Sequence, residues 1–288
     1  MFKVPVTYLF AFEFTDERSR RYAMHDFACH GAKHLVLCDA LFEMIFGNFK
    51  LEKKFLDEMA AEGLSFCDAH APFGTGLDMC TPDEALRPQM LLRHRLALQI
   101  CAEMGVNTIT IHTGTEKAFP DYPLEVQYDA VRRSLDELLP MAEKLGITIC
   151  LENIWYRLTT VDRLLGLKKL FPTDKLGFCY DSGHANVFAK GWTPDATAWR
   201  NWTPVPPELD DHVLEKMLPE VVSCHLHDNH GFRDEHLLPG RGNIDWKHII
   251  GLLKQAPRLA CIQSEVSTIN QCVTPGELCA AFRELGEL

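Results

Sequence analysis

Residues 176–186 read LGFCYDSGHAN, and this stretch carries the pattern from which the fold can be inferred. An apolar segment runs up to the acid Asp181, and His184 follows shortly after it. Continuous apolar character is typical of a strand buried on both faces, as in a parallel sheet covered by helices. Acidic and imidazole groups at the end of such a strand indicate an active site, because α/β barrels carry theirs at the C-terminal strand ends.

The same pattern recurs along the whole chain. Apolar segments predict strands at 4–11, 34–38, 64–70, 107–112, 147–152, 176–181, 221–227 and 259–265. Amphipathic segments predict helices near 16–31, 50–62, 83–105, 124–145, 160–170, 211–219, 245–255 and 275–286. This alternation, without a Ser/Gly linker, predicts an α/β fold, a single (β/α)8 TIM barrel with residues 1–288 as one domain. An open doubly wound sheet is the alternative, but no GxGxxG turn follows the first strand.

Two Thr-Pro pairs predict where helices begin. The strings TPDE at 81–84 and TPGE at 274–277 each place a threonine before a proline and a glutamate two residues after that proline. Such a threonine caps a helix, and proline is well tolerated in the first helical turn. We therefore expect helices to start just after Thr81 and Thr274.

One compositional break interrupts the alternation, at about 187–210 after the sixth strand. This insertion is rich in tryptophan and proline. It is predicted either to form a lid or stacking wall over a sugar, or to be a packed loop or subunit contact. The second interpretation is compatible with a homodimer.

Composition bounds the class of partner. The chain has 288 residues, of which 47% are hydrophobic and 24% charged, enough for a sizeable core in a globular protein. Its formal net charge is −11, which disfavours a nucleic-acid partner and favours a small-molecule substrate. Bound cations can reverse the potential at one site, so the net charge by itself does not decide the substrate.

The cysteines and the N-terminus bear on location. The 11 cysteines show no disulfide-like spacing and no CxxC pair, which predicts reduced thiols in a cytoplasmic protein without a zinc-thiolate site. The N-terminal residues lack the basic start and long apolar stretch of a signal peptide. No apolar run approaches the roughly 18 residues of a membrane span, so no membrane association is expected.

Nine side chains that can bind a metal lie at or just past predicted strand ends. Glu152, Asp181, His225 and Glu265, here called the inner set, end strands five to eight and can converge on one divalent ion. An oxygen-rich set of this kind suits Mn²⁺, Mg²⁺ or Co²⁺, and also accepts Zn²⁺. A barrel-mouth salt bridge is the alternative for any single acid.

The other five candidates extend the centre to as many as three ions. His70 and His112 end strands three and four and can hold a second ion together with Glu152; neutral hydrogen bonding to substrate is their alternative role. The outer set can hold a third ion and consists of His184, Asp234 and His236. Five imidazoles among nine ligands favour zinc. His227 and His230 are expected to contact and orient the metal ligands without binding the metal themselves.

These residues lie in recognisable strings. They are CDAHAPFG at 67–74, TIHTG at 110–114, CLEN at 150–153, GFCYDSGHAN at 177–186 and HLHDNHGFRDEHLLPGRGNIDW at 225–246. The chain resembles the xylose-isomerase-like barrel superfamily, specifically the group that joins endonuclease IV with sugar-phosphate isomerases and epimerases. The resemblance covers nearly the whole chain, and the strings fall in family order.

The resemblance implies two different uses of the ligands. In endonuclease IV three zinc ions are bound, at the positions that match the inner set, the outer set and the group of His70, His112 and Glu152. In the ketose epimerases the inner set alone holds one metal, Glu152 and Glu265 move protons on opposite faces of the sugar, and His184 contacts a substrate oxygen. The strings after His70 and His225 depart from the nuclease, whose strand-seven string is closer to HLNDSK. They are more similar to those of the isomerase side of the group.

The sequence therefore predicts a metal-dependent isomerase or epimerase of a sugar, sugar phosphate or related polyol. The metal polarises a carbonyl and stabilises an enediolate, while Glu152 and Glu265 exchange a proton as base and acid. Phe73 and Trp155 are expected to line the sugar, and Arg241 to meet a phosphate or else to be a surface turn residue. The alternative is a zinc-dependent phosphodiesterase of the abasic-site endonuclease IV type, and a dehydratase is a third option. A non-enzymatic role requires a displaced ligand, and none is missing from the pattern.

Overall fold

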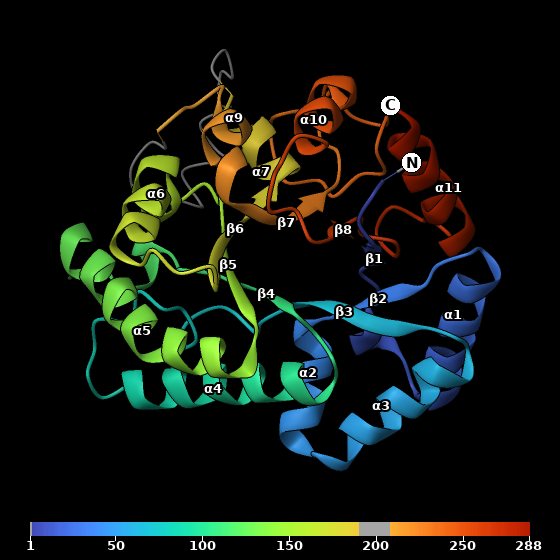
Figure 1. The fold of residues 1–288 in the computed structure, drawn as a ribbon, viewed down its shortest axis with the longest axis horizontal. Coiled ribbons are helices and arrows are strands. Elements are labelled where there is room, and N and C mark those ends of the chain that lie inside the picture. Colours follow the sequence, from blue (N-terminus) through green and yellow to red (C-terminus); the bar gives the residue numbers. More distant parts are fainter. Residues whose placement is uncertain (1, 190–207) are drawn as a thin grey trace.

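The computed structural model describes residues 2–189 and 208–288, and within them eight parallel strands close into a barrel surrounded by helices (Figure 1). Each strand pairs with the next in the chain, and β8 pairs with β1 to close the ring. The strands are β1 (Val6–Tyr8), β2 (His34–Leu37), β3 (Ser65–His70), β4 (Thr108–Ile111), β5 (Thr148–Glu152), β6 (Leu176–Asp181), β7 (Val221–Leu226) and β8 (Ile262–Ser264). The predicted α/β barrel is confirmed.

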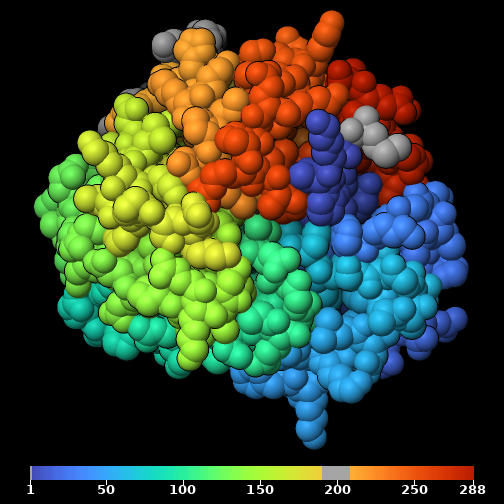
Figure 2. Space-filling model, viewed as in Figure 1, coloured from blue at the N-terminus to red at the C-terminus, as the bar shows by residue number. Residues whose placement is uncertain are grey.

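Helices cover the outside of the barrel. They are α1 (Glu17–Cys29), α2 (Asp39–Gly47), α3 (Lys50–Ala61), α4 (Arg87–Glu103), α5 (Leu124–Leu145), α6 (Val161–Leu170), α7 (Ser182–Val187), α9 (Val213–Met217), α10 (Trp246–Leu253) and α11 (Pro275–Glu287). Short 3-10 turns lie at η1 (Phe12–Phe14), η2 (Glu116–Ala118), η3 (Arg157–Thr159) and η4 (Leu218–Glu220). The N-terminal segment lies beside the C-terminal helix (Figure 2), where Phe2 packs against Gly286.

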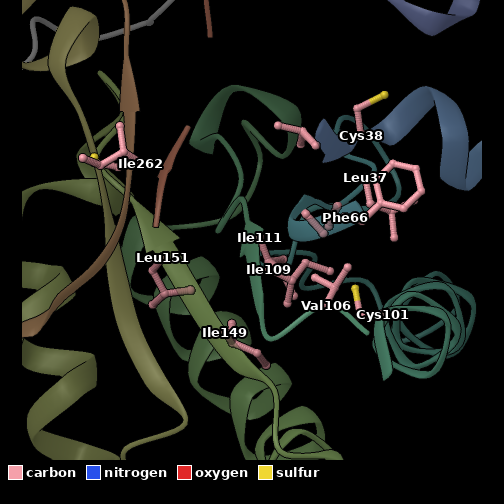
Figure 3. Close-up of a cluster of buried hydrophobic side chains, with 14 of the residues drawn as sticks. Leu37, Cys38, Phe66, Cys101, Val106, Ile109, Ile111, Ile149, Leu151 and Ile262 are labelled. Atoms are coloured by element: carbon pink, nitrogen blue, oxygen red, sulfur yellow. The ribbon is translucent and has the colours of Figure 1, made fainter. Parts of the chain in front are cut away.

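Strand alternation separates an apolar shell from a polar interior. Ile109 and Ile111 of β4 lie in the shell near Cys101 of α4 (Figure 3). Thr108, directly before Ile109, turns inward and donates a hydrogen bond of 2.6 Å to Asp68. Asp68 is fully buried, and burial raises the pKa of its carboxyl. Successive side chains of a strand point to opposite faces, so a residue an even number of positions after an inward-facing one also points inward. Residues of this kind at the strand ends point into the barrel mouth.

The predicted helices differ from the structure in one start and in one helix that was not predicted. A helix start at Thr81 is wrong, because the Thr81 hydroxyl donates to the carbonyl of Asp78 at 2.7 Å and closes a turn. α4 begins later, at Arg87. α2 was not predicted, because its run DALFEMIFG is short and apolar, and such a run lacks a distinctive period.

The insertion predicted at 187–210 falls largely on residues 190–207, outside the described residues, so the lid, wall or dimer contact expected there stays a prediction. Within the described residues, none of the helices combines the length and apolar character of a membrane span.

The start predicted at Thr274 is confirmed and gives a testable stability effect. The Glu277 amide donates to the Thr274 hydroxyl at 3.2 Å, and the Glu277 carboxylate accepts from the Thr274 amide at 2.9 Å. Thr274→Ala removes the first of these bonds and is expected to cost about 1 kcal/mol, a fall of roughly 2–4 °C in Tm. Thermal unfolding checks this, with Thr274→Ser as the control that keeps the hydroxyl. Equal losses in both variants would contradict the capping role.

Candidate active site

Strand ends deliver the inner set to one point in the barrel mouth. Glu152 and Asp181 are the last residues of β5 and β6, His225 lies near the end of β7, and Glu265 directly follows β8. His225 Nδ1 lies 3.3 Å from Glu152 Oε1, 3.4 Å from Glu265 Oε1 and 3.9 Å from Asp181 Oδ2. Ligand atoms bonded at about 2.1 Å to one tetrahedral ion lie about 3.4 Å apart. The spacing and chemistry of the inner set therefore fit a divalent ion.

The two histidines predicted to share Glu152 are also brought to it. His70 Nε2 and His112 Nε2 lie 3.2 Å apart, and they lie 3.8 Å and 3.0 Å from Glu152 Oε2. These separations again match the donors of one ion. Burial lowers the pKa of His112, whereas the Glu152 carboxylate outweighs burial at His70 and raises its pKa. A metal binds only to an unprotonated imidazole nitrogen. Metal binding at His70, whose pKa is raised, would therefore be accompanied by proton release.

The outer set is held together by Asp234. Its Oδ2 atom lies 3.4 Å from His184 Nε2 and 2.7 Å from His236 Nε2. His184 Nδ1 donates to the carbonyl of Asn153 at 3.0 Å, and His236 Nδ1 donates to the carbonyl of Glu265 at 2.8 Å. Both rings therefore present Nε2 to the same carboxylate. A second nitrogen fixed by a carbonyl is the usual arrangement of a metal-binding histidine.

The two glutamates of the inner set have opposite electrostatic environments. Burial favours the neutral form of Glu152, but the imidazoles of His225, His112 and His184 outweigh it and hold its pKa well below the ordinary value. Burial raises the pKa of Glu265 well above the ordinary value, and the charges of Glu152 and Asp181 add to this. Opposite pKa shifts of two carboxyl groups in one site are the pattern of a base and an acid.

These groups open onto a cavity of about 340 Å³. Its walls are formed by Leu9, Asp39, His70, Phe73, His112, Glu152, Ile154, Trp155, Tyr156, His184, Asp234, His236 and Glu265. Predicted substrate contacts Phe73, Trp155 and His184 therefore lie in this wall. The Trp155 ring stands edge-on to His184 at 4.7 Å between centroids, and Phe73 lies 4.6 Å from His112. The volume is at the small end of the range for small-molecule sites.

Arg241 is not brought into this site. It is absent from the cavity wall, and it lies close to the N-terminus of α11. There the pKa of Glu277 is lowered by hydrogen bonds from Thr274 and also by the charge of Arg241. The placement fits the turn-residue alternative and does not bring the guanidinium to a phosphate in the cavity.

Two supporting residues, Asn153 and Asp39, were missed by the sequence prediction, whereas His227 was predicted in a supporting position. Asn153 joins two strand ends, since it donates to the carbonyl of Asp181 at 3.0 Å and accepts from the Asp181 amide at 2.8 Å. Asp39 follows β2, lines the cavity and contributes to the raised pKa of His70. His227 points at the site, with Nε2 3.1 Å from Asp181 Oδ2. Position just after a strand is the signal that all three share.

Asp228 fixes the long loop that carries the outer set. Its carboxylate accepts from the backbone amides of Gly240 and Ile244, at 2.8 Å and 3.2 Å, and from the Trp246 indole at 2.9 Å. Asp228 also pairs with Leu237 through two backbone hydrogen bonds of 2.8 Å. A fully buried carboxylate with this many donors holds the segment around Asp234 and His236 in place.

Two relatives share part of the sequence. Uncharacterized protein MJ1311 of Methanocaldococcus jannaschii is 27% identical over 221 residues, which cover 75% of this chain and 69% of that protein. A probable endonuclease 4 of Aquifex aeolicus is 29% identical over 196 residues, which cover 64% of each.

Solved structures with similar folds cover nearly the whole chain. A D-tagatose 3-epimerase-like protein superposes with a TM-score of 0.75 at 20% identity, covering 99% of this chain and 96% of that one. The IOLI protein with a bound zinc atom superposes with a TM-score of 0.70 at 17% identity, covering 97% and 96%. The family model described as a xylose isomerase-like TIM barrel matches residues 28–264. This match covers most of the chain, which therefore belongs to the xylose isomerase-like TIM barrel family.

Proposed function

We propose that the protein is a metal-dependent isomerase or epimerase of a sugar or related polyol, acting through an enediolate. The observation that carries the proposal is the placement of Glu152 and Glu265. Both approach His225 Nδ1, at 3.3 Å and 3.4 Å, and both line one small cavity. The similar fold of a D-tagatose 3-epimerase-like protein supports this class of reaction.

The inner set would hold the catalytic ion, Zn²⁺, Mn²⁺, Co²⁺ or Mg²⁺. Such an ion polarises the substrate carbonyl and stabilises the negative charge that develops on it. The histidines add donors for up to two further ions and favour zinc among these metals. The zinc atom in the IOLI protein is consistent with this choice.

Glu152 and Glu265 would move the proton. Glu152 is ionised and buried, with 1% of its surface exposed, so it can take a proton from the carbon next to the carbonyl. The pKa of Glu265 is raised relative to that of Glu152, so its carboxyl can carry a proton and return it to the same or the opposite face. The roles exchange in the reverse direction, because a reversible reaction uses the same groups.

The remaining wall residues would bind and orient the sugar. His184 has Nδ1 3.2 Å from Glu152 Oε1, so it can present its ring to a substrate oxygen beside the base. The rings of Phe73 and Trp155 supply apolar faces for the C–H side of a sugar. Phe73 is 50% exposed and lies at the entrance, where a bound substrate would cover it.

The described side chains of the cavity wall offer a phosphate group no cationic partner besides bound metal. Asp39, Glu152, Asp234 and Glu265 contribute to the wall, and among the described residues neither lysine nor arginine does. A phosphate near these acids would have no cationic side chain to pair with in the described part of the wall. We expect kcat/KM for a phosphorylated ketose to be at least about 10-fold below that for the free ketose, a difference of about 1.4 kcal/mol. Parallel rates on matched pairs check this, and a preference for the phosphate form would contradict it.

Proton exchange tests the proposed function. Metal-loaded protein is incubated with a panel of free ketoses, aldoses and polyols in D₂O, and loss of a substrate C–H signal is followed by ¹H NMR. Exchange accompanied by a new isomer or epimer is expected with at least one member. A chelated sample is the control. No exchange with any member by protein of measured metal content would count against the sugar chemistry.

A zinc-dependent phosphodiesterase is the second candidate. It is favoured by the close grouping of His70, His112 and Glu152 and by the probable endonuclease 4 among the relatives. The net charge of −11 opposes binding to duplex DNA. Cleavage of a duplex with one abasic site at physiological salt tests it, with His70→Ala as the control. Metal-dependent cleavage lost in this variant would establish the nuclease and displace the isomerase.

A further inference from the structure

His227 is a buried imidazole in the barrel mouth that neither the inner nor the outer set includes. It follows the last residue of β7 and lies two residues after His225, so both rings project from the same side of the strand. None of its surface is exposed. The His227 ring has no role in proton transfer by the two glutamates, and it does not line the cavity of the candidate active site.

Three carboxylates converge on one nitrogen of His227. Its Nε2 atom lies 3.1 Å from Asp181 Oδ2, 3.7 Å from Asp234 Oδ1 and 3.8 Å from Glu265 Oε2. These separations bracket the spacing of about 3.4 Å between two donors of one tetrahedral ion. His227, Asp181 and His184 also offer donor atoms that all lie within 4.8 Å of one another.

Asp234 supplies an independent indication of a missing partner. Its Oδ2 atom faces His184 and His236, whereas Oδ1 is buried and accepts no hydrogen bond from the residues that the structure describes. A buried carboxylate oxygen without a donor costs free energy, so such an atom calls for a cation or another partner. This unpartnered oxygen faces His227 Nε2 at 3.7 Å.

The His227 ring is held from both sides. On one side a Cβ atom at Gly183 would lie 2.0 Å from Cε1 of the ring, so only glycine fits there. On the other side the His236 ring stacks at 4.1 Å between centroids with an angle of 18°. His236 itself has a left-handed backbone with φ of 50°, uncommon for a residue other than glycine. Fixed ring orientation is what a ligand position needs.

We propose that His227 is a metal ligand through Nε2, in a cation site that it forms with Asp181 and Asp234. Asp181 would then bridge this ion and the ion of the inner set. Imidazole and carboxylate donors in this number suit zinc or cobalt. The proposal rests on the metal centre of the proposed function and adds a ligand and a site to it.

Metal content of a single variant tests the proposal. His227→Gln keeps a hydrogen-bond donor near the position of Nε2, so it can still support Asp181, but it removes the imidazole ligand. We expect the variant to hold one equivalent of Zn²⁺ or Co²⁺ fewer than the wild type after equilibrium dialysis. The visible spectrum of the Co²⁺ protein should change with it. His230→Gln is the matched control, because His230 is half-exposed and pairs with Glu235.

The outcomes separate a ligand from a residue that only positions Asp181. A positioning role predicts the wild-type number of ions with affinities about 10–100-fold weaker, and this result would overturn the proposal. Anomalous scattering from zinc-loaded wild-type crystals gives a second measurement that needs no variant. An ion at about 2.0–2.1 Å from His227 Nε2 is expected, and a zinc-loaded mouth without an ion there overturns the proposal.

Failure of the proposed function is distinguishable from failure of this inference. Zinc bound at His227 without proton exchange on any sugar would leave the ligand in place and count against the isomerase. Proton exchange on a sugar, with equal metal content in the wild type and His227→Gln, would do the reverse.

Discussion

Glu152→Gln and Glu265→Gln are each expected to lower conversion of substrate by about 10²–10⁴-fold, the usual contribution of a positioned acid or base. Glutamine has nearly the same shape as glutamate but cannot take up or release the proton at neutral pH. Each glutamate lies within 3.4 Å of His225 Nδ1, so the change removes a proton-transfer group at the centre of the site. Rates of isomer or epimer formation by the two variants check this.

Exchange with D₂O in the same variants separates an epimerase from an isomerase. If the glutamates serve opposite faces, each variant keeps exchange with only one of the two epimers and converts neither. If both act along one proton path, exchange is lost with either substrate. Wild-type conversion in either variant, at wild-type metal content, would contradict the two-glutamate scheme.

The control for these variants is Glu235→Gln. Glu235 lies in the loop of the outer set and pairs with His230, but it does not line the cavity. Its replacement changes the charge of the same loop by the same amount as the test variants change the site. We expect it to retain conversion, so a loss confined to positions 152 and 265 reports on proton transfer and not on net charge.

The barrel and the inner set could be predicted because each depends on local pattern. A strand buried on both faces is apolar throughout. The alternation of side chains along the strand directs its last residue, Glu152 or Asp181, into the mouth, and this does not depend on the neighbouring strands. α2 could not be predicted in this way, since its apolar run fits a strand as well as a buried helix. The start of α4 depended on a turn at Asp78 that competes for the Thr81 hydroxyl.

Supporting residues depend on contacts between distant segments, which a single sequence does not show. Asn153 matters because the end of β6 lies beside the end of β5, and Asp228 because the chain returns to it at Gly240 and Trp246. His227 had a usable signal. The string HLH puts it on the same side of the strand as His225, and the period of two predicts that both rings enter the mouth.

Removal of the metal is expected to abolish conversion and to lower Tm. The mouth gathers Glu152, Asp181, Asp234 and Glu265, and the first two raise the pKa of Glu265 by repulsion in addition to burial. A bound cation relieves this repulsion only in the folded state, because the unfolded chain does not assemble the donors. An ion at about 100 times its Kd stabilises the fold by about 2.7 kcal/mol, a rise of roughly 5–10 °C in Tm.

The difference in Tm between metal-loaded and metal-free protein is expected to grow as pH rises. Folding raises the pKa of Glu265 and that of His184, the latter because the carboxylates of Asp181 and Asp234 outweigh burial. A group whose pKa is higher in the folded state than in the unfolded state stabilises the fold fully at pH values below its unfolded-state pKa. This stabilisation is lost as pH rises through its folded-state pKa. For Glu265 the loss begins above about pH 4.5, and for His184 above about pH 6.5.

The carboxylates with lowered pKa act in the opposite direction but in a lower range. Glu152 and Asp234 contribute stability above their unfolded values, and this contribution is lost only as pH falls toward the lowered pKa values. Between about pH 5 and pH 8 they stay ionised, so the raised groups control the trend. The contribution of Glu265 and His184 to the stability of metal-free protein should therefore fall across this interval, while bound ions replace the protons in the loaded protein. Thermal scans of chelated and reloaded protein across this range check the trend, and a Tm difference that shrinks toward pH 8 would contradict a metal centre built from these ligands.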